Sequence, residues 1–158
     1  MIEAYFDGAC EPVNPGGTAA YGVVVYKDKK RIWQQSKLFV PMRGREKETS
    51  NNVAEYSAFL SLLHYLLDHK LNEEKIIVYG DSMLVLCQML MDHPEWHKRY
   101  RIKRGFYVGL ALQAQMLMWR FPKMEGHWIP REKNTIADEL SKAELIRAGV
   151  QFRIQLAS

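Results

Sequence analysis

The order in which strand-like and helix-like segments follow one another most constrains the fold of this chain. Two apolar runs, residues 19–27 and 31–40, flank the tight turn Asp28-Lys29-Lys30 and are predicted to pair as a β-hairpin. After residue 52, helical and strand periodicities alternate. A hairpin followed by such alternation is typical of a mixed α/β sheet, in which the later strands lie parallel to the first through right-handed crossovers.

Periodicity and turn residues give the bounds of the expected elements. Strands are predicted at residues 2–6, 19–27, 31–40, 75–79 and 124–130. Helices are predicted at residues 52–68, 82–91, 105–118 and 134–148, and the last should stop at Gly149. We therefore expect one domain with a five-stranded mixed sheet, antiparallel over the first three strands and parallel over the last two, flanked by helices.

Composition narrows the class of protein. The net charge of +4 mildly favours an anionic partner. The two cysteines, Cys10 and Cys87, are too few for a disulfide framework, and no Cys/His spacing resembles a zinc site. With no apolar run of membrane-spanning length and no leader-like start, we expect an intracellular, cytoplasmic protein that has no membrane partner and acts as a monomer.

Two acidic residues of the first half stand in unusual places. Asp7 directly follows the first predicted strand, where an Asp often simply starts a turn. Glu55 shares a helical stripe with Phe59 and Leu62, so its carboxylate would be pushed toward the core. The alternative for Glu55 is a capping box, in which Asn52 caps the helix and Glu55 reaches back to the cap amide.

Asp81 and Asp138 stand at the starts of predicted helices. Asp81 follows the apolar strand, where ligand-binding groups of such sheets gather, but it also suits a helix N-cap. Asp138 could form a loose capping box with Thr135.

Helix caps and turns explain each acid by itself. They do not explain why all four acids lie at junctions between strands and helices, which one sheet can bring close together. Four adjacent carboxylates repel one another, and a hard cation such as Mg²⁺ relieves that repulsion. We therefore predict a site for two Mg²⁺ ions that activates water and stabilises the leaving oxygen of a phosphodiester. Its ligands, and the catalytic residues, are Asp7, Glu55, Asp81 and Asp138.

Five ordered segments, spanning nearly the whole chain, resemble type 1 ribonuclease H. They are Asp7-Gly8-Ala9-Cys10 with Asn14-Pro15-Gly16, then Tyr21-Gly22, then Ser50-Asn51-Asn52-Val53-Ala54-Glu55-Tyr56, then Tyr79-Gly80-Asp81-Ser82, and last Trp128-Ile129-Pro130-Arg131 with Asn134 and Ala137-Asp138-Glu139-Leu140-Ser141. The resemblance implies a single ribonuclease H domain over residues 1–158. It also implies hydrolysis of the RNA strand of RNA–DNA hybrids, leaving a 3′-hydroxyl and a 5′-phosphate.

The resemblance also implies residue roles. Asp7 would bridge both ions, Asp138 would share the water-activating ion, and Glu55 with Asp81 would hold the ion on the leaving-group side, with Mn²⁺ able to replace Mg²⁺. Glu55 would also accept a hydrogen bond from an RNA 2′-hydroxyl. Further substrate contacts would come from Gly8, Cys10, Asn14, Ser50, Asn51, Asn52 and Met83. Helix capping is the alternative for residues 50–52, and core packing is the alternative for Met83.

The sequence departs from the family pattern in three places. Glu11-Pro12-Val13 is one residue longer than the commonest form of the first loop. The loop after the last strand, residues 130–134, lacks the His that the family often places there, and His127 lies inside the strand, where a structural role is expected. The basic segment 97–104 is shorter than the family's longest protrusion, and it is either a phosphate-binding surface or a solvated face. Candidate phosphate contacts are Lys98, Arg99, Arg101 and Arg131.

Two other functions compete with the nuclease. One is a catalytically silent hybrid- or RNA-binding module, which the four acids disfavour because binding alone needs no negative cluster facing phosphates. The other is a different enzyme on the same scaffold, such as a junction resolvase, an exonuclease or an integrase. Asn14, Asn51 and Asn52 disfavour it, since these groups suit reading of a hybrid in the minor groove.

Overall fold

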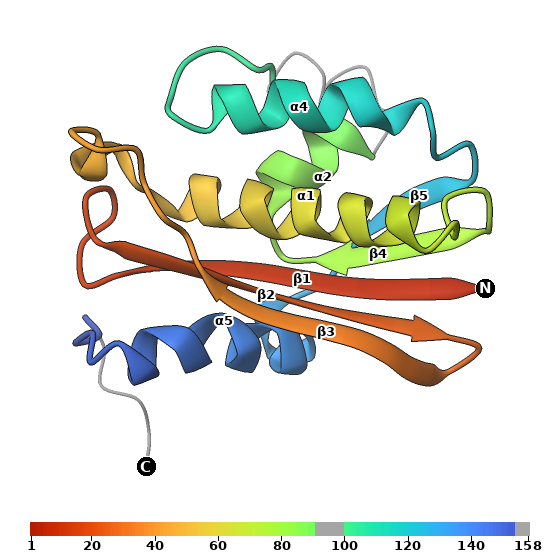
Figure 1. Cartoon of the computed structure of the whole chain (residues 1–158), viewed down its shortest axis with the longest axis horizontal. Helices are drawn as coiled ribbons and strands as arrows, with labels where there is room; N and C mark the ends of the chain where they lie inside the picture. Colours follow the sequence, from red (N-terminus) through yellow and green to blue (C-terminus); the bar gives the residue numbers. More distant parts are fainter. Residues whose placement is uncertain (91–99, 154–158) are drawn as a thin grey trace.

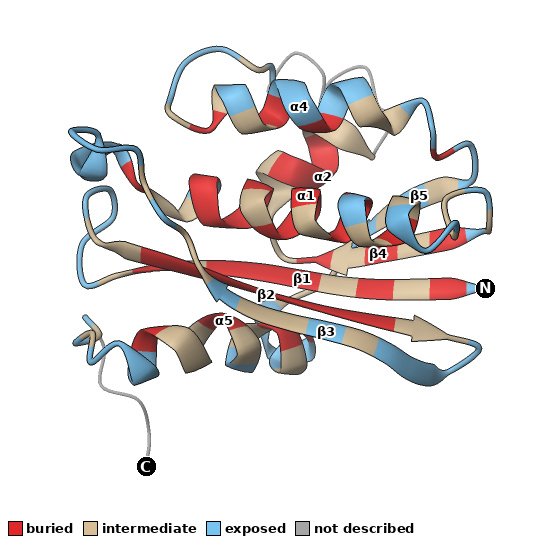
Figure 2. Cartoon of the chain, in the orientation of Figure 1, coloured by how far each residue is buried: buried red, intermediate tan, exposed pale blue. Residues whose placement is uncertain are grey.

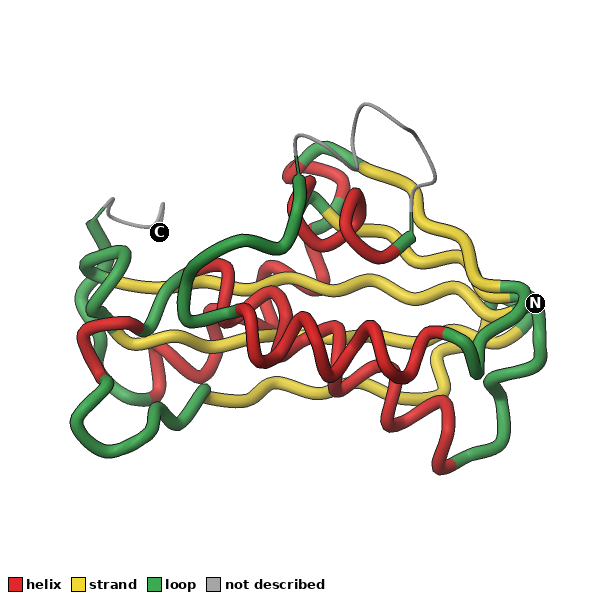
Figure 3. The backbone as a smooth tube through the Cα atoms, turned by 90° about the horizontal axis from the view of Figure 1, so that it is seen from above, coloured by secondary structure: helices red, strands yellow, loops and turns green. Residues whose placement is uncertain are grey.

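Five strands form one mixed sheet in the computed structural model, which describes residues 1–90 and 100–153. The strand order is β3-β2-β1-β4-β5, and the strands run along the long axis of the molecule (Figures 1 and 3). The first three are antiparallel, whereas β4 is parallel to β1 and β5 is parallel to β4. Their bounds are Ile2–Glu11 for β1, Thr18–Lys27 for β2, Lys30–Leu38 for β3, Ile76–Gly80 for β4 and Met124–Trp128 for β5.

Helices cover both faces of this sheet. On one face α1 packs on β1 and β2, with α2 and α4 against it, and on the other face α5 packs on β1, β2 and β3 (Figure 1). The bounds are Asn51–Asp68 for α1, Met83–Met89 for α2, Val108–Met118 for α4 and Thr135–Arg147 for α5. Short 3₁₀ turns occupy Glu46–Glu48 (η1) and Arg131–Lys133 (η2). The predicted fold class is confirmed, and no helix in the described ranges is long and apolar enough to span a membrane.

The predicted hairpin turn is confirmed in its backbone geometry. Asp28 and Lys29 both have positive φ, 49° and 70°, and Lys27 pairs with Lys30 across the turn. Positive φ at both central residues is the requirement of the type I′ turn, whose twist matches that of the flanking strands.

Strand β1 is longer than predicted, and this changes the place of Asp7. The expected strand ended at residue 6, but the observed one continues to Glu11, which pairs with Thr18 of β2. Asp7 therefore lies inside the strand, opposite Gly22, and the interpretation that it starts a turn is wrong. The pairing available from β2 keeps this stretch extended despite its polar Asp and its glycine. The remaining predicted bounds differ by one to three residues, as expected of fraying element ends.

The main core lies between α1 and the sheet (Figure 2). Alternate residues of β1, Ile2, Ala4 and Phe6, are fully buried there, and the Phe6 and Phe59 rings are 5.9 Å apart. The strand's period of two sends Asp7 to the opposite side from Phe6. Helix α1 is thus fixed firmly against β1 next to the first predicted acid.

Candidate active site

Three of the four predicted acids form one compact cluster. Asp7 comes from β1, Glu55 from the second turn of α1, and Asp81 from the residue after β4. One carboxylate oxygen from each lies within 4.8 Å of the others. Asp138, in the first turn of α5, adjoins the cluster closely enough to raise the pKa of Asp7. The structure therefore brings all four acids together.

Gly8 allows α1 to approach β1 closely enough to place Glu55. A Cβ atom at Gly8 would lie 2.6 Å from the Glu55 backbone nitrogen and 2.7 Å from the Ala54 Cβ. These contacts are too short for any side chain. The glycine beside Asp7 therefore brings the helix backbone, and with it the Glu55 carboxylate, onto the strand that carries Asp7.

Glu55 is not part of a capping box. The N-cap of α1 is Ser50, whose hydroxyl accepts a hydrogen bond from the Val53 backbone nitrogen at 3.3 Å. Glu55 lies too far into the helix to reach the cap amide, and its side chain is directed inward, only 3% exposed. The interpretation that Asn52 caps the helix is wrong, and the cap leaves Glu55 free for the acidic cluster.

The capping interpretations of Asp81 and Asp138 are also wrong. The N-cap of α2 is Ser82, whose hydroxyl accepts from the Val85 backbone nitrogen at 3.3 Å. The N-cap residue of α5 is Asn134, one position before Thr135, so Asp138 lies past the capping-box position. Both acids are thereby left to the cluster.

Two contacts hold α5 against the sheet beside Asp7. A Cβ atom at Gly22, the residue paired with Asp7, would lie 2.5 Å from the Leu140 Cβ and 2.6 Å from the Ala137 carbonyl oxygen. The buried Asn134 side chain donates a hydrogen bond from Nδ2 to the Phe6 carbonyl oxygen at 2.9 Å. Close packing and this bond together bring the first turn of α5, which carries Asp138, to the acid on β1.

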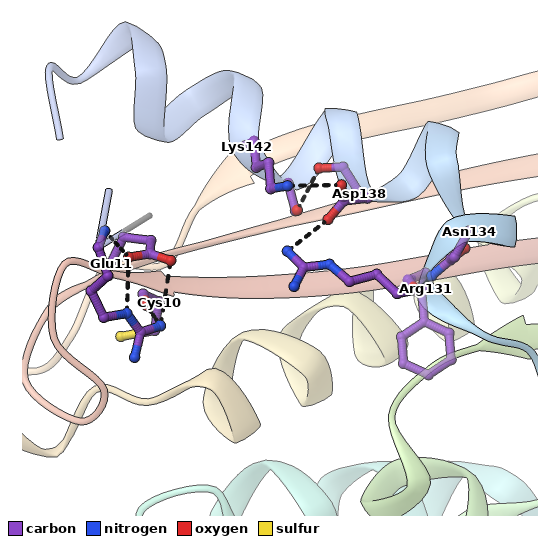
Figure 4. A network of polar contacts seen from close by, with 9 residues as sticks. Cys10, Glu11, Arg131, Asn134, Asp138 and Lys142 are labelled. Atoms are coloured by element: carbon purple, nitrogen blue, oxygen red, sulfur yellow. Dashed lines mark hydrogen bonds and ion pairs between the residues drawn. The ribbon is translucent and has the colours of Figure 1, made fainter. Parts of the chain in front are cut away.

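Two cations contact Asp138. Lys142, one turn later on α5, donates from Nζ to Oδ2 at 2.9 Å, and Arg131 donates from Nη2 to Oδ1 at 3.5 Å. Both side chains point toward Asp138 (Figure 4). The spacing of four residues between Asp138 and Lys142 is that of neighbours on one helix face. These two cations therefore fix the Asp138 carboxylate from two sides.

The other three acids all have a raised pKa, chiefly because they are buried. Burial and the Asp81 charge raise the pKa of Asp7 to about 8, and Asp138 adds to the effect. Burial and the Asp7 and Asp81 charges raise the pKa of Glu55 well above its usual range. Burial also raises the pKa of Asp81, against a hydrogen bond with Asp7 and the charge of Arg131. Such a cluster keeps protons near neutral pH unless another positive charge replaces them.

The cluster fits a hard cation that prefers oxygen ligands. The Glu55 Oε2 atom is buried and, among the described residues, makes no hydrogen bond. A buried carboxylate oxygen without a partner is costly, and a metal ion would satisfy it. Carboxylates in this number and proximity are the ligands of Mg²⁺ and Mn²⁺ sites.

The acids open into a cleft that contains most of the predicted substrate residues. Gly8, Cys10, Asn14, Asn51, Asn52, Met83 and Arg131 all line it with Asp7, Glu55 and Asp81. The Asn14 Oδ1 atom accepts a hydrogen bond from the Asn51 backbone nitrogen at 2.9 Å, which ties the first loop to the start of α1. The longer first loop therefore still delivers Asn14 to the cleft. The Cys10 thiol is buried beneath that loop, beside the Val13 carbonyl oxygen. Cys10 therefore lines the cleft with its backbone and not with its thiol.

Other predicted contacts lie elsewhere. Ser50 caps α1 and does not line the cleft, nor does Arg101, which is exposed. Lys98 and Arg99 fall outside the described residues. His127 lies within β5, 5.8 Å from the Tyr79 ring, with its side chain exposed, and the structural role expected for it stays a prediction. The phosphate contacts suggested for Arg101 and Arg131 stay predictions.

Three residues in the cleft or beside Asp138 were not predicted from the sequence. Lys142 had a usable signal, since it stands four residues after Asp138. Glu11 and Arg153 both line the cleft and form an ion pair, with Nε 3.1 Å from Oε2. Their separation of 142 residues along the chain gives no local pattern that would predict the contact.

Known proteins match this fold and this order of residues. The family described as reverse transcriptase-like matches residues 5–144. The bifunctional protein Rv2228c of Mycobacterium tuberculosis is 35% identical over 129 residues, which are 81% of this chain. The chain spans only 31% of the length of that relative.

Solved structures extend the similarity to the whole fold. LC11-RNase H1, solved in complex with an RNA/DNA hybrid, is 31% identical with a TM-score of 0.75, covering 94% of this chain and 99% of its own. The N-terminal RNase H domain of Rv2228c from Mycobacterium tuberculosis is 26% identical with a TM-score of 0.71, covering 94% and 97%. RNase H1 of the halophilic archaeon Halobacterium salinarum is 25% identical with a TM-score of 0.66, covering 92% and 98%.

Proposed function

Because the chain belongs to the reverse transcriptase-like family and is of the type 1 ribonuclease H kind, we propose that it hydrolyses the RNA strand of RNA–DNA hybrids. The proposed reaction is an endonucleolytic cleavage that leaves a 3′-hydroxyl and a 5′-phosphate. The supporting observation is the meeting of Asp7, Glu55 and Asp81 within 4.8 Å in a cleft that Asn14, Asn51 and Asn52 also line. A site that only bound nucleic acid would not gather acids where phosphates must lie.

We propose that two Mg²⁺ ions, for which Mn²⁺ can substitute, are held by the four carboxylates. Asp7 would be the shared ligand, because its carboxylate adjoins those of Glu55 and Asp81 and also interacts with Asp138. Asp138 joins it on one side, and Glu55 and Asp81 join it on the other. When bound, such ions lower the pKa of an attacking water and stabilise charge on the leaving oxygen.

The chain's own residues provide substrate orientation and selectivity. Glu55 lies at the meeting point of α1 and β1, where its carboxylate can accept a hydrogen bond from an RNA 2′-hydroxyl. Asn51 and Asn52, in the first turn of α1, face the same cleft and can reach base edges in the minor groove, where readout is nearly independent of sequence. All four acids come from one chain, so we propose that a monomer suffices.

Cleavage assays on four substrates test this proposal. The full chain is incubated with Mg²⁺ or Mn²⁺ and end-labelled RNA–DNA hybrid, duplex RNA, duplex DNA or single strands. We expect cleavage of the RNA strand of the hybrid, inhibition by EDTA, and 5′-phosphate ends on the downstream products. Asp7→Asn should lower the rate by about a thousand-fold or more.

Asp68→Asn is the matched control. Asp68 is exposed at the end of α1, so this substitution removes the same charge outside the cleft. It should cleave like the unaltered protein. An intact hybrid in both metals, together with retained binding, would refute the nuclease and support a binding module. Cleavage of duplex RNA as well would widen the substrate class.

A further inference from the structure

The segment after α5 turns back to the cleft because of Gly149. Gly149 has a φ of 74°, its backbone nitrogen bonds to the Ile146 carbonyl oxygen at 3.0 Å, and the Val150 nitrogen bonds to the Leu145 carbonyl oxygen at 3.0 Å. These two bonds with a left-handed glycine define a Schellman motif. The motif ends α5, and the chain then reaches the end of β1, where Arg153 meets Glu11.

Arg153 is fixed at the cleft by four hydrogen bonds. Its Nε donates to Glu11 Oε2 at 3.1 Å, and its Nη2 donates to Glu11 Oε1 at 3.4 Å and to the Cys10 carbonyl oxygen at 3.0 Å. Its backbone nitrogen also donates to Glu11 Oε2 at 3.0 Å. Figure 4 shows Glu11 and Cys10 together at the end of β1. The planar guanidinium is thereby held in one orientation.

This arrangement leaves part of the guanidinium available. In residues 1–90 and 100–153, Arg153 Nη1 makes no hydrogen bond, and the side chain stays 50% exposed. The partner carboxylate of Glu11 is only 17% exposed, so Arg153 covers the acid and presents its own cation outward. Both residues line the same cleft as Asp7, Glu55 and Asp81.

The electrostatics of the cleft agree with an anion-binding role. Hydrogen bonds and the charge of Arg153 lower the pKa of Glu11 despite its partial burial, and the charge of Arg131 lowers it further. Two guanidinium groups from distant parts of the chain therefore act on one carboxylate. They are the basic side chains that line a cleft otherwise rich in acids, within the part of the chain that the structure describes.

We propose that Arg153 is a substrate-binding residue that contacts a backbone phosphate of the nucleic acid, with Glu11 and the Cys10 carbonyl holding its guanidinium in place. The proposal rests on the nuclease function proposed above and adds a contact from the segment after α5. A guanidinium presents paired N–H groups that match phosphate oxygens. A guanidinium that is already held in place loses less conformational entropy when it binds the phosphate. Arg153 contacts no acid of the metal cluster, so its role is in binding and not in the chemical step.

The salt dependence of hybrid binding measures this contact directly. Each neutralised phosphate contributes about one unit to the slope of log K against log salt concentration. Binding of a labelled hybrid is measured in EDTA at several salt concentrations, and cleavage is measured separately in Mg²⁺. Arg153→Gln should flatten the slope by about one unit, weaken binding about ten-fold at low salt, and raise KM with little change in kcat.

Arg147→Gln is the matched control. Arg147 also lies near the end of α5 and pairs with an acid, Glu144, at 3.0 Å, but it does not line the cleft. Its loss changes the net charge by the same amount and should leave the slope unaltered. Arg153→Lys keeps the charge without the fork and should keep most of the slope.

A purely structural role for Arg153 predicts other results. A lower melting temperature for Arg153→Gln, with a slope equal to that of Arg147→Gln, would overturn the proposal. So would an equal loss of slope in Arg153→Lys and Arg153→Gln. These outcomes are distinct from failure of the proposed function, which would show as absence of cleavage by the unaltered protein in either metal.

Discussion

The raised pKa of Asp7 makes the free energy of unfolding depend on pH. Its pKa is about 8 in the folded protein, chiefly through burial and the charge of Asp81, against an ordinary value of 3.8. The folded state therefore binds this proton more tightly than the unfolded state does. Between about pH 4 and pH 8, the free energy of unfolding must then fall as pH rises, because the proton that stabilises the folded form is being removed.

We predict that thermal melting in EDTA shows this dependence. The melting temperature of the unaltered protein should decrease from pH 5 to pH 8. Asp7→Asn, which cannot ionise, should flatten the decrease and melt higher than the unaltered protein at pH 8. A variant that melts lower than the unaltered protein at pH 8 would contradict the assignment.

Asn134 is the buried polar residue that fixes the start of α5 to β1. Asn134→Ala leaves the Phe6 carbonyl oxygen without its donor, and we expect a loss of about 1–3 kcal/mol in the free energy of unfolding. The cleavage rate should fall as well, since Asp138 is carried by the same turn. Denaturant unfolding and single-turnover cleavage measure the two effects.

Asn72→Ala is the control for Asn134→Ala. Asn72 makes the same kind of bond, from Nδ2 to the Arg120 carbonyl oxygen at 2.9 Å, but in an exposed place. Water can replace that bond, so the loss should be small. Equal losses for the two variants would show that the buried bond has no special role.

At the level of single residues, the sequence predicted the acids but not their surroundings. The four carboxylates were identified by their positions and by the ribonuclease H resemblance, which is confirmed. Capping within residues 50–52 is confirmed at Ser50, whereas the choice of Asn52 was wrong because Ser and Asn are nearly equal as N-caps. The bond from Asn134 to Phe6 spans 128 residues and has no local signal.

The close packing of α5 against β2 depends on Gly22, so we predict that Gly22→Ala is disruptive. The new Cβ would lie 2.5–2.7 Å from atoms of Leu140, Ala137 and Ser141, two of them helix backbone atoms that cannot move alone. Overpacking of this kind costs about 1–3 kcal/mol or more. We expect a lower melting temperature and slower cleavage, because α5 must shift away from Asp7.

Gly109→Ala tests whether that effect is specific. Gly109 lies in α4, where an added Cβ meets nothing within 4 Å. Alanine in a helix is favoured over glycine by about 1 kcal/mol, so this variant should melt at the same temperature or higher. Similar destabilisation by both variants would argue against close packing as the cause.

At the level of elements, strand and helix periodicities together with turn residues were enough to predict the sheet and its helices. Where the prediction failed, a partner strand decided the outcome. The stretch after residue 6 has the composition of a turn, yet it continues β1 because β2 pairs with it as far as Glu11. Such pairing is a property of two segments at once, and a local pattern records only one of them.

Across the whole molecule, the proposed metal site should link β1, α1, α5 and the end of β4 reversibly. We predict that Mg²⁺ raises the melting temperature, since it binds only where folding has brought the acids together. At a concentration about ten-fold above Kd, the gain is about 1.4 kcal/mol, or roughly 3–6 °C for a chain of this size.

The stabilisation should grow with pH, because protons and cations compete for the same carboxylates. Calorimetric or fluorescence melts with and without Mg²⁺, at pH 6 and pH 8, measure it. Asp7→Asn should remove most of the effect. An equal shift in that variant would mean that the cation acts elsewhere on the molecule.

The position of Asp7 within β1 has a mechanical consequence. A small local motion can withdraw an acid that lies on a loop, and the protein then stays folded although its site is displaced. Asp7 is paired to Gly22 in the adjacent strand, with α1 and α5 packed on the two faces beside it. It can leave its place only if the central strand parts from its neighbours, which would dismantle the domain. The fold and the geometry of the proposed site are therefore lost together in this molecule.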